Sequence, residues 1–147
     1  MRVIPLPKAP ASTSMAVRHS MHGNSVRQTK IESSLADLLI ENGLTGFVQN
    51  DKSLEGTPDI AYPSNRLAIF VHGCFWHRCP YCEPHFPEIN ADYWQAKFAR
   101  NKRRDKHAQV SLKREGWRVV TVWECKLKNN PHNVLRRIRS AMKNTNG

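Results

Sequence analysis

Four cysteines are the first side chains in this sequence whose type and spacing could do chemistry. Three lie within nine residues and the fourth far downstream: Cys74, Cys79, Cys82 and Cys125. Zinc prefers a tetrahedron of soft ligands, which four thiolates provide. Because Cys79 and Cys82 have C-x-x-C spacing and the N-terminal residues lack the apolar run of a secretory signal, we predict a structural zinc site. His77 and His85 are competing ligands, and unliganded thiols are the alternative.

Three carboxylates stand out in an otherwise basic chain. Asp59 is at the start of a predicted strand, Asp105 is on the inward stripe of a predicted helix, and Glu32 is near the start of another helix. Together they could hold Mg²⁺ against a phosphodiester. Each also has a structural alternative: Asp59 could cap a turn, Asp105 could pair with an arginine, and Glu32 could complete a capping box.

The segment HGCFWH combines two histidines with two aromatic rings. His72 ends an apolar strand and His77 follows five residues later. Histidine transfers protons near neutral pH, so this pair could activate water and assist a leaving oxygen. Phe75 and Trp76, expected to be exposed in a loop, could stack on bases or wedge between them. The alternatives are zinc ligation or a structural role for the histidines, and rings that cover the sheet.

Composition points to one folded domain with a polyanionic partner. The chain has 147 residues, 39% of them hydrophobic, and a formal net charge of +11. Such a charge favours nucleic acid, although a ribosomal or membrane-surface protein would have the same balance. No apolar run reaches the roughly 20 residues needed to span a bilayer.

Periodicity and breakers define the elements that must position these residues. Residues 1–18 are typical of a flexible basic tail, and residues 19–147 of one domain. Residues 73–90, rich in proline, are expected to be a loop. The predicted helices are 30–42, 91–114 and one starting at Asn130-Pro131, and the predicted strands are 47–49, 60–62, 67–71 and 117–123.

The helix over 91–114 has an inward stripe at spacings of three and four residues. Asn90 is its expected N-cap. The stripe consists of Trp94, Phe98, Asn101, Asp105, Ala108 and Leu112. With strands 60–62 and 67–71 as a hairpin, the order of elements predicts an α/β fold with a mixed central sheet flanked by helices.

Four blocks of the chain resemble the very short patch repair (Vsr) DNA mismatch endonucleases. They are Asp59, FVHGCFWH from Phe70 to His77, Asn101 to Asp105, and GWRVVTVWEC from Gly116 to Cys125, within roughly residues 18–127. The resemblance implies a PD-(D/E)xK-like nuclease core with a structural zinc. It also implies nicking of one strand 5′ of the thymine in a T:G mismatch left by deamination of 5-methylcytosine.

The resemblance implies roles for individual residues. Asp59 matches the Mg²⁺-binding aspartate, His72 and His77 the active-site histidines, and Glu32 and Asp105 the acidic residues around the metal. The four cysteines fall on the zinc positions. Intercalation beside the mismatch is implied for Phe75, Trp76, Trp94 and, from the other groove, Met21. There are departures from the family pattern: C-P-Y-C replaces a histidine-containing segment, and the usual (D/E)xK is absent.

The predicted reaction is metal-assisted phosphodiester hydrolysis. Asp59 would bind Mg²⁺ with the backbone carbonyl of Val71, and His77 would be the candidate general base. The division of roles between His72 and His77 stays open. The competing functions are a restriction or nicking endonuclease on the same core, and a zinc-stabilised DNA-binding module without catalysis. We expect a monomeric cytoplasmic protein, associated with the bacterial nucleoid, with mismatch-repair proteins as candidate partners and no membrane association.

Overall fold

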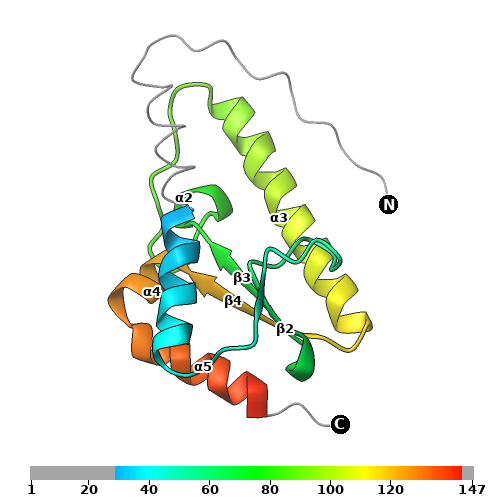
Figure 1. Cartoon of the computed structure of the whole chain (residues 1–147). Helices are drawn as coiled ribbons and strands as arrows, with labels where there is room; N and C mark the ends of the chain where they lie inside the picture. The colour runs from blue at the N-terminus through cyan, green and yellow to red at the C-terminus, as the bar shows by residue number, and fades with distance from the viewer. Residues whose placement is uncertain (1–28, 144–147) are drawn as a thin grey trace.

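The computed structural model describes residues 29–143, so the predicted tail over 1–18 and Met21 lie outside the described residues. A helix over residues 29–41, here called the N-terminal helix, comes first (Figure 1). The other elements are β1 (Val48–Gln49), β2 (Ile60–Tyr62), a 3-10 turn (Pro63–Asn65), β3 (Leu67–His72), α2 (Cys74–His77), α3 (Ala91–Arg114), β4 (Arg118–Trp123), α4 (Glu124–Asn129) and α5 (Pro131–Lys143).

The four strands form one mixed sheet in the order β1-β2-β3-β4. The pairs β1–β2 and β2–β3 are antiparallel, which confirms the predicted hairpin, whereas β3 and β4 run parallel. Parallel strands require a crossover connection, and α3 provides it. The register pairs His72 with Trp123. The segments that follow β3 and β4 therefore leave the sheet side by side at one edge.

Helices cover both faces of the sheet, as predicted (Figure 1). The N-terminal helix and α5 pack on one face, where Leu67, Ile69 and Val71 point inward from β3. On the other face, Ala68 and Phe70 contact Ala108 and Leu112 of α3. Side chains alternate along a strand, so this pattern directs His72 to the α3 face.

Two short helices were not predicted. Cys74–His77 forms α2 where a continuous loop is expected over 73–90, and α4 follows β4 directly. In α2 the His77 N–H donates to the Gly73 carbonyl at 3.1 Å, and Arg78 ends the turn at φ 52°. A single helical turn is too short to show a 3.6-residue period, which explains why the sequence pattern missed it.

The boundaries of α3 and its N-cap residue both match the prediction. Asn90 occupies the N-cap position in a left-handed conformation, and its side chain makes no capping hydrogen bond. On the stripe, the side chains of Phe98, Asn101, Ala108 and Leu112 are buried. Trp94 and Asp105 are half-buried, so they remain accessible to a ligand.

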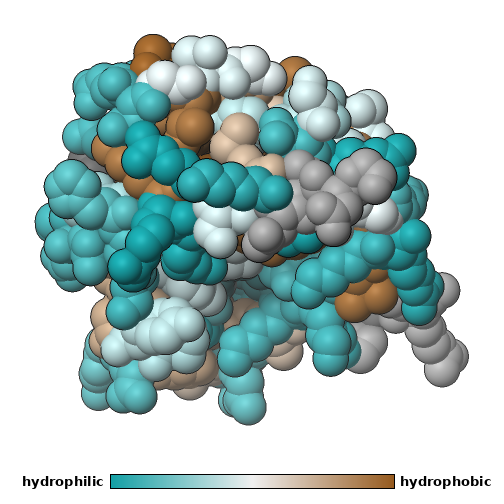
Figure 2. Space-filling view, turned by 90° about the horizontal axis from the view of Figure 1, so that it is seen from below, coloured by the Kyte–Doolittle hydropathy of each residue, from teal (hydrophilic) through white to brown (hydrophobic). Residues whose placement is uncertain are grey.

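The molecular face at the α5 end is covered mainly by hydrophilic side chains (Figure 2). Helix α5 has no acidic residue and exposes Arg136, Arg137, Arg139 and Lys143. Its buried side is formed by Val134, Leu135 and Ile138. Among the described residues, no helix is both long and apolar enough to cross a membrane.

Candidate active site and cysteine cluster

Asp59 lies immediately before β2, on the α3 face of the sheet. Ile60 points into the core on the opposite face, and the β2–β3 register pairs it with Ile69. Alternation therefore turns the preceding residue towards α3. Its Oδ2 accepts a hydrogen bond of 2.7 Å from the Val71 N–H. The hairpin thus fixes Asp59 beside the Val71 backbone, the pair predicted to hold Mg²⁺.

Glu32 of the N-terminal helix meets Asp59 across the sheet edge. Burial is the main reason why the pKa of Asp59 rises from 3.8 to about 7. The Val71 N–H opposes this rise, whereas a hydrogen bond to Glu32 and the charge of Glu32 add to it. Without a cation, the site therefore keeps a proton on Asp59 up to neutral pH. The two carboxyl groups are in contact and partly buried. A hard divalent cation bound to them would stabilise their charged forms.

His72, His77 and Asp105 form a second polar cluster on the same face. The His77 Nδ1 lies 2.6 Å from Asp105 Oδ2, and the His72 Nε2 lies 3.9 Å from the same oxygen. The two imidazole rings stack with centroids 3.9 Å apart and an interplanar angle of 3°. Because Asp105 holds Nδ1 of His77, the other ring nitrogen of His77 is left for a water molecule or a substrate oxygen.

His72 is adapted to remain neutral. Burial is the main cause that lowers its pKa from 6.5 to about 4; the neighbouring His77 lowers it further, and Asp105 acts in the opposite direction. Its Nδ1 is buried and, among the described residues, has no hydrogen-bond partner. At neutral pH this ring is therefore a neutral group with one N–H and one free lone pair.

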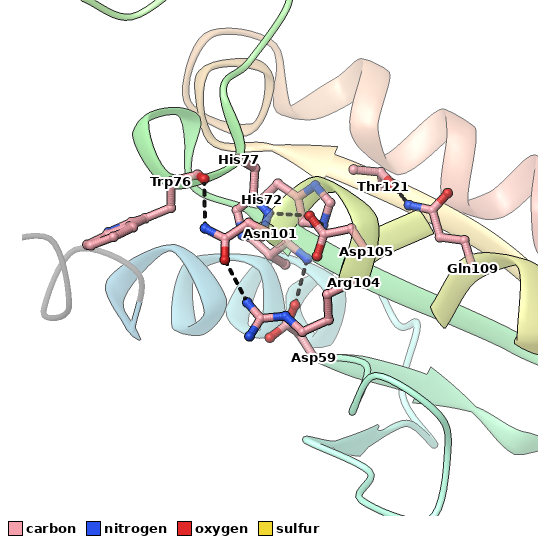
Figure 3. A network of polar contacts seen from close by, with 10 residues as sticks. Asp59, His72, Trp76, His77, Asn101, Arg104, Asp105, Gln109 and Thr121 are labelled. Carbon is pink, nitrogen blue, oxygen red and sulfur yellow. Dashed lines mark hydrogen bonds and ion pairs between the residues drawn. The ribbon is translucent and has the colours of Figure 1, made fainter. Parts of the chain in front are cut away.

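These groups line one cavity of about 780 Å³ (Figure 3). Asp59 and Val71 line it from the sheet and His72 and His77 from the ends of β3 and α2. One side of α3 closes it with residues that have no predicted role: Lys97, Arg100, Asn101 and Arg104. Asn101 is on the predicted inward stripe, and an amide among apolar positions is the signal that could have drawn attention to it.

The aromatic residues predicted to intercalate form a cluster beside this cavity. The Phe75 ring contacts both Trp76 and Trp94 edge-on, with centroids 5.4 Å and 5.6 Å apart. Trp76 is also one of the residues that line the cavity. The expectation that Phe75 and Trp76 are exposed in a loop is wrong, because both are half-buried on α2, where it packs against α3. A covering role and a recognition role are therefore both compatible with their position.

The four cysteines come together beyond the ends of β3 and β4. Their sulfur atoms all lie within 4.8 Å of one another. The Cys79 and Cys125 sulfurs are 3.7 Å apart. This separation matches the roughly 3.8 Å edge of a tetrahedron with Zn–S bonds of 2.3 Å. The cluster includes neither His77, which is bound to Asp105, nor His85.

Backbone groups already favour thiolates in this cluster. The Cys125 N–H donates to the Cys74 sulfur at 3.4 Å, and the Tyr81 N–H donates to the Cys79 sulfur at 3.4 Å. Burial raises the pKa of Cys79, but hydrogen bonds from the N–H groups of Cys82 and Tyr81 and from the Cys125 and Cys82 side chains together outweigh it, so its pKa is lowered overall. Burial raises the pKa of Cys74 and of Cys125. A bound cation would offset that cost, as expected of a metal site.

Besides the cysteine cluster, two groups of side chains could hold a metal ion, and these two groups differ in their donor atoms. Asp59 and Glu32 offer carboxylate oxygens, which Mg²⁺ prefers. His72, His77 and Asp105 also lie close enough to share an ion, but two nitrogens and one oxygen suit softer metals. Because Asp105 already binds His77, this second cluster has the geometry of a proton-transfer pair.

Comparison with known proteins gives consistent matches. The family described as DNA mismatch endonuclease Vsr matches residues 12–83. The type II nicking enzyme V.XorIIP of Xanthomonas oryzae pv. oryzae is 41% identical over 110 residues, which are 75% of this chain and 80% of the relative. The DNA mismatch endonuclease Vsr of Escherichia coli K12 is 40% identical over 109 residues, 74% of this chain and 69% of the relative. The type II nicking enzyme V.NmeAIP of Neisseria meningitidis serogroup A is 33% identical over 122 residues, 79% of this chain and 86% of the relative.

Proposed function

Because this chain belongs to the Vsr family of DNA endonucleases, we propose that it nicks one DNA strand 5′ of the thymine in a T:G mismatch. The observation that carries this proposal is the convergence of Asp59, His72, His77 and Asp105 on one cavity beside an aromatic cluster. A binding module without catalysis has no need for buried titratable groups at this position. A nicking assay on mismatched and matched duplexes tests the proposal.

In the proposed mechanism, Asp59 and the backbone carbonyl of Val71 would hold Mg²⁺, and Glu32 and Asp105 would help to position it and the nearby water. When bound, Mg²⁺ neutralises charge on the phosphate and acidifies water. His77 takes the proton of the attacking water, because Asp105 fixes its ring and stabilises the resulting imidazolium. His72 is neutral, so it donates a hydrogen bond to the leaving 3′ oxygen, or passes on a proton that its other ring nitrogen takes up from a water molecule. The stacking of the His72 and His77 rings is compatible with these two roles, because only one of the two rings needs to be charged at a time.

The aromatic cluster supports recognition of a mismatch. Phe75, Trp76 and Trp94 form one block of rings next to the reaction centre. Inserting rings beside a base pair costs unstacking energy, and that cost is smallest where pairing is already poor. A T:G pair would therefore admit the rings more readily than a matched pair.

A second candidate activity is nicking at an intact recognition sequence. It is favoured by the names of V.XorIIP and V.NmeAIP, which are type II nicking enzymes. The same site residues serve both activities. A matched duplex nicked as fast as a T:G duplex would favour this second activity.

Protonation of Asp59 is expected to limit nicking below about pH 7. The pKa of Asp59 is raised in the folded protein, so the metal-free fold binds a proton that the unfolded chain releases. Stability of the metal-free protein should therefore fall as pH rises from about 4 to about 7. Because Mg²⁺ competes with this proton, higher Mg²⁺ concentrations should shift the acid limb of the rate profile to lower pH.

Carboxyl-carbon NMR of the metal-free protein measures this pKa directly. Glu32→Gln removes the charge that raises the pKa of Asp59, so the titration should move to lower pH in this variant. Burial of Asp59 still acts in the variant, so part of the shift should remain. An Asp59 carboxyl group that titrates near its ordinary value of 3.8 in the parent would contradict the prediction.

Removal of the rings should reduce discrimination between T:G and matched duplexes. In the Phe75→Ala, Trp76→Ala double variant, the ratio of the affinity for the T:G duplex to the affinity for the matched duplex is expected to fall about tenfold or more. The reason is that stacking on one base contributes about 1–3 kcal/mol. Nonspecific, salt-sensitive binding depends on the cations and should change much less. Affinity for both duplexes at two salt concentrations measures each effect.

Circular dichroism separates a recognition role from a covering role. If the rings only cover α3, the double variant should lose structure, and all binding should fall together. Trp76→Leu keeps apolar bulk and serves as the variant that preserves packing. A folded double variant with the parent's affinity ratio would mean that the rings do not recognise the mismatch.

A further inference from the structure

One face of α3 presents three cations to the cavity. Lys97, Arg100 and Arg104 lie at spacings of three and four residues, so they share that face. The Lys97 ammonium already rests over the Trp76 ring at 4.8 Å. Arg104 differs from both neighbours, because its guanidinium is held by a hydrogen bond of 3.1 Å from Nη2 to Asn101 Oδ1.

Asn101 is a rigid anchor for this arginine. The residue is only 7% exposed, and its Nδ2 donates to the Trp76 carbonyl at 3.2 Å. That carbonyl lies in the last turn of α2, where no partner within the helix is available. The Asn101 amide is therefore hydrogen-bonded at both ends: its nitrogen binds α2, the helix that carries Phe75 and Trp76, and its oxygen binds Arg104.

Arg104 lines the same cavity as Asp59, His72 and His77. Figure 3 shows its guanidinium group beside the Asn101 amide, with which it forms the hydrogen bond. Within residues 29–143, Arg104 forms no ion pair with a carboxylate. An anchored guanidinium with free N–H groups, directed into a cavity beside a metal-binding carboxylate, fits a phosphate anion.

We propose that Arg104 binds a non-bridging oxygen of the scissile phosphate and that Asn101 positions it there. This inference rests on the proposed function and names the group that holds the substrate at that site. As water attacks phosphorus and the bond to the 3′ oxygen breaks, negative charge increases on the non-bridging oxygens. A guanidinium that is already oriented stabilises this charge without reorganisation. Asn101 also links α2 to the reaction centre, so seating of Trp76 and alignment of the phosphate are coupled.

Neutralising the scissile phosphate tests the contact independently of catalysis. The position that the full-length parent nicks is mapped first, and a duplex with a methylphosphonate there is compared with the ordinary phosphodiester in metal-free buffer. The ratio of the two dissociation constants should be about tenfold smaller in Arg104→Ala than in the parent, because one charge-assisted hydrogen bond is lost. Arg103→Ala is the matched control, since Arg103 is exposed on α3 and does not line the cavity.

Rates test the roles of both residues. Arg104→Ala should lower kcat about 100-fold, Arg104→Lys should recover part of this loss, and Arg103→Ala should keep the parent rate. Asn101→Ala should lower kcat about tenfold in the parent background but only about twofold when Arg104 is already alanine. A merely structural role of Asn101 would give equal effects in both backgrounds and would overturn its positioning role.

The possible failures are distinguishable. A parent that nicks no duplex overturns the proposed function, and the present inference with it. A parent that nicks normally, with Arg104→Ala indistinguishable from Arg103→Ala in both measurements, overturns the assignment of Arg104 and leaves the proposed function intact.

Discussion

Asp59→Ala is expected to abolish Mg²⁺-dependent nicking while DNA binding persists. Asp59 is the carboxylate that the β2–β3 hairpin holds against the Val71 N–H, and its pKa is raised mainly by burial. Loss of a metal ligand removes several kcal/mol of transition-state stabilisation, which corresponds to a rate loss of about 1,000-fold or more. Single-turnover nicking of a labelled duplex measures this loss.

Affinity for the mismatched duplex should be unchanged or tighter in Asp59→Ala, because a negative charge near the phosphate is removed. Asp37→Ala is the matched control: this carboxylate is exposed on the N-terminal helix, away from the cavity. The control should nick at the parent rate. If Asp59→Ala nicks nearly as well as Asp37→Ala, the assignment of the metal site is wrong.

Cys125→Ser is expected to release zinc and destabilise the domain by several kcal/mol. Cys125 lies in the first turn of α4, which follows β4, whereas Cys74, Cys79 and Cys82 follow β3. A metal shared by both segments would fasten α2 to α4 beyond the ends of these strands. The free energy of metal binding is then part of the free energy of folding. Metal analysis of the purified parent should find about one zinc per chain, and urea unfolding gives the stability difference.

A chelator provides the control for this prediction. It should lower the thermal stability of the parent almost to that of Cys125→Ser, and should change the variant little. A parent that lacks zinc, or that loses zinc without a change in thermal stability, would contradict a structural metal. Unliganded thiols would then be the better description of the cluster.

Long, strongly patterned elements could be predicted from the sequence. The stripe from Trp94 to Leu112 predicted α3 with its observed boundaries, because nineteen residues contain several helical periods. The apolar run that ends at Val71 predicted a buried strand, because a strand that is covered on both faces is apolar at every position. The cysteine spacing predicted a four-sulfur cluster, because only a few ligand geometries satisfy zinc.

Features that depend on tertiary contacts could not be predicted. The single turn of α2 is too short for a periodic signal, so Phe75 and Trp76 were expected in a loop. Glu32 and Asp59 were grouped around one metal from their residue types and the family resemblance, but the hydrogen bond between them joins separate elements, and no local pattern encodes it. The bond from Arg104 to Asn101 is local in sequence, but its direction into the cavity follows from how α3 packs on the sheet.

The site of cleavage in a T:G duplex is the most direct measurement of the proposed activity. A 5′-labelled duplex with one T:G pair, and the same duplex with a matched pair, are incubated with the full-length protein with and without Mg²⁺. One nick is expected, 5′ of the mismatched thymine, only with Mg²⁺ and only in the strand that contains this thymine. Equal nicking of the matched duplex, or tight binding without any nick, would contradict the proposed activity.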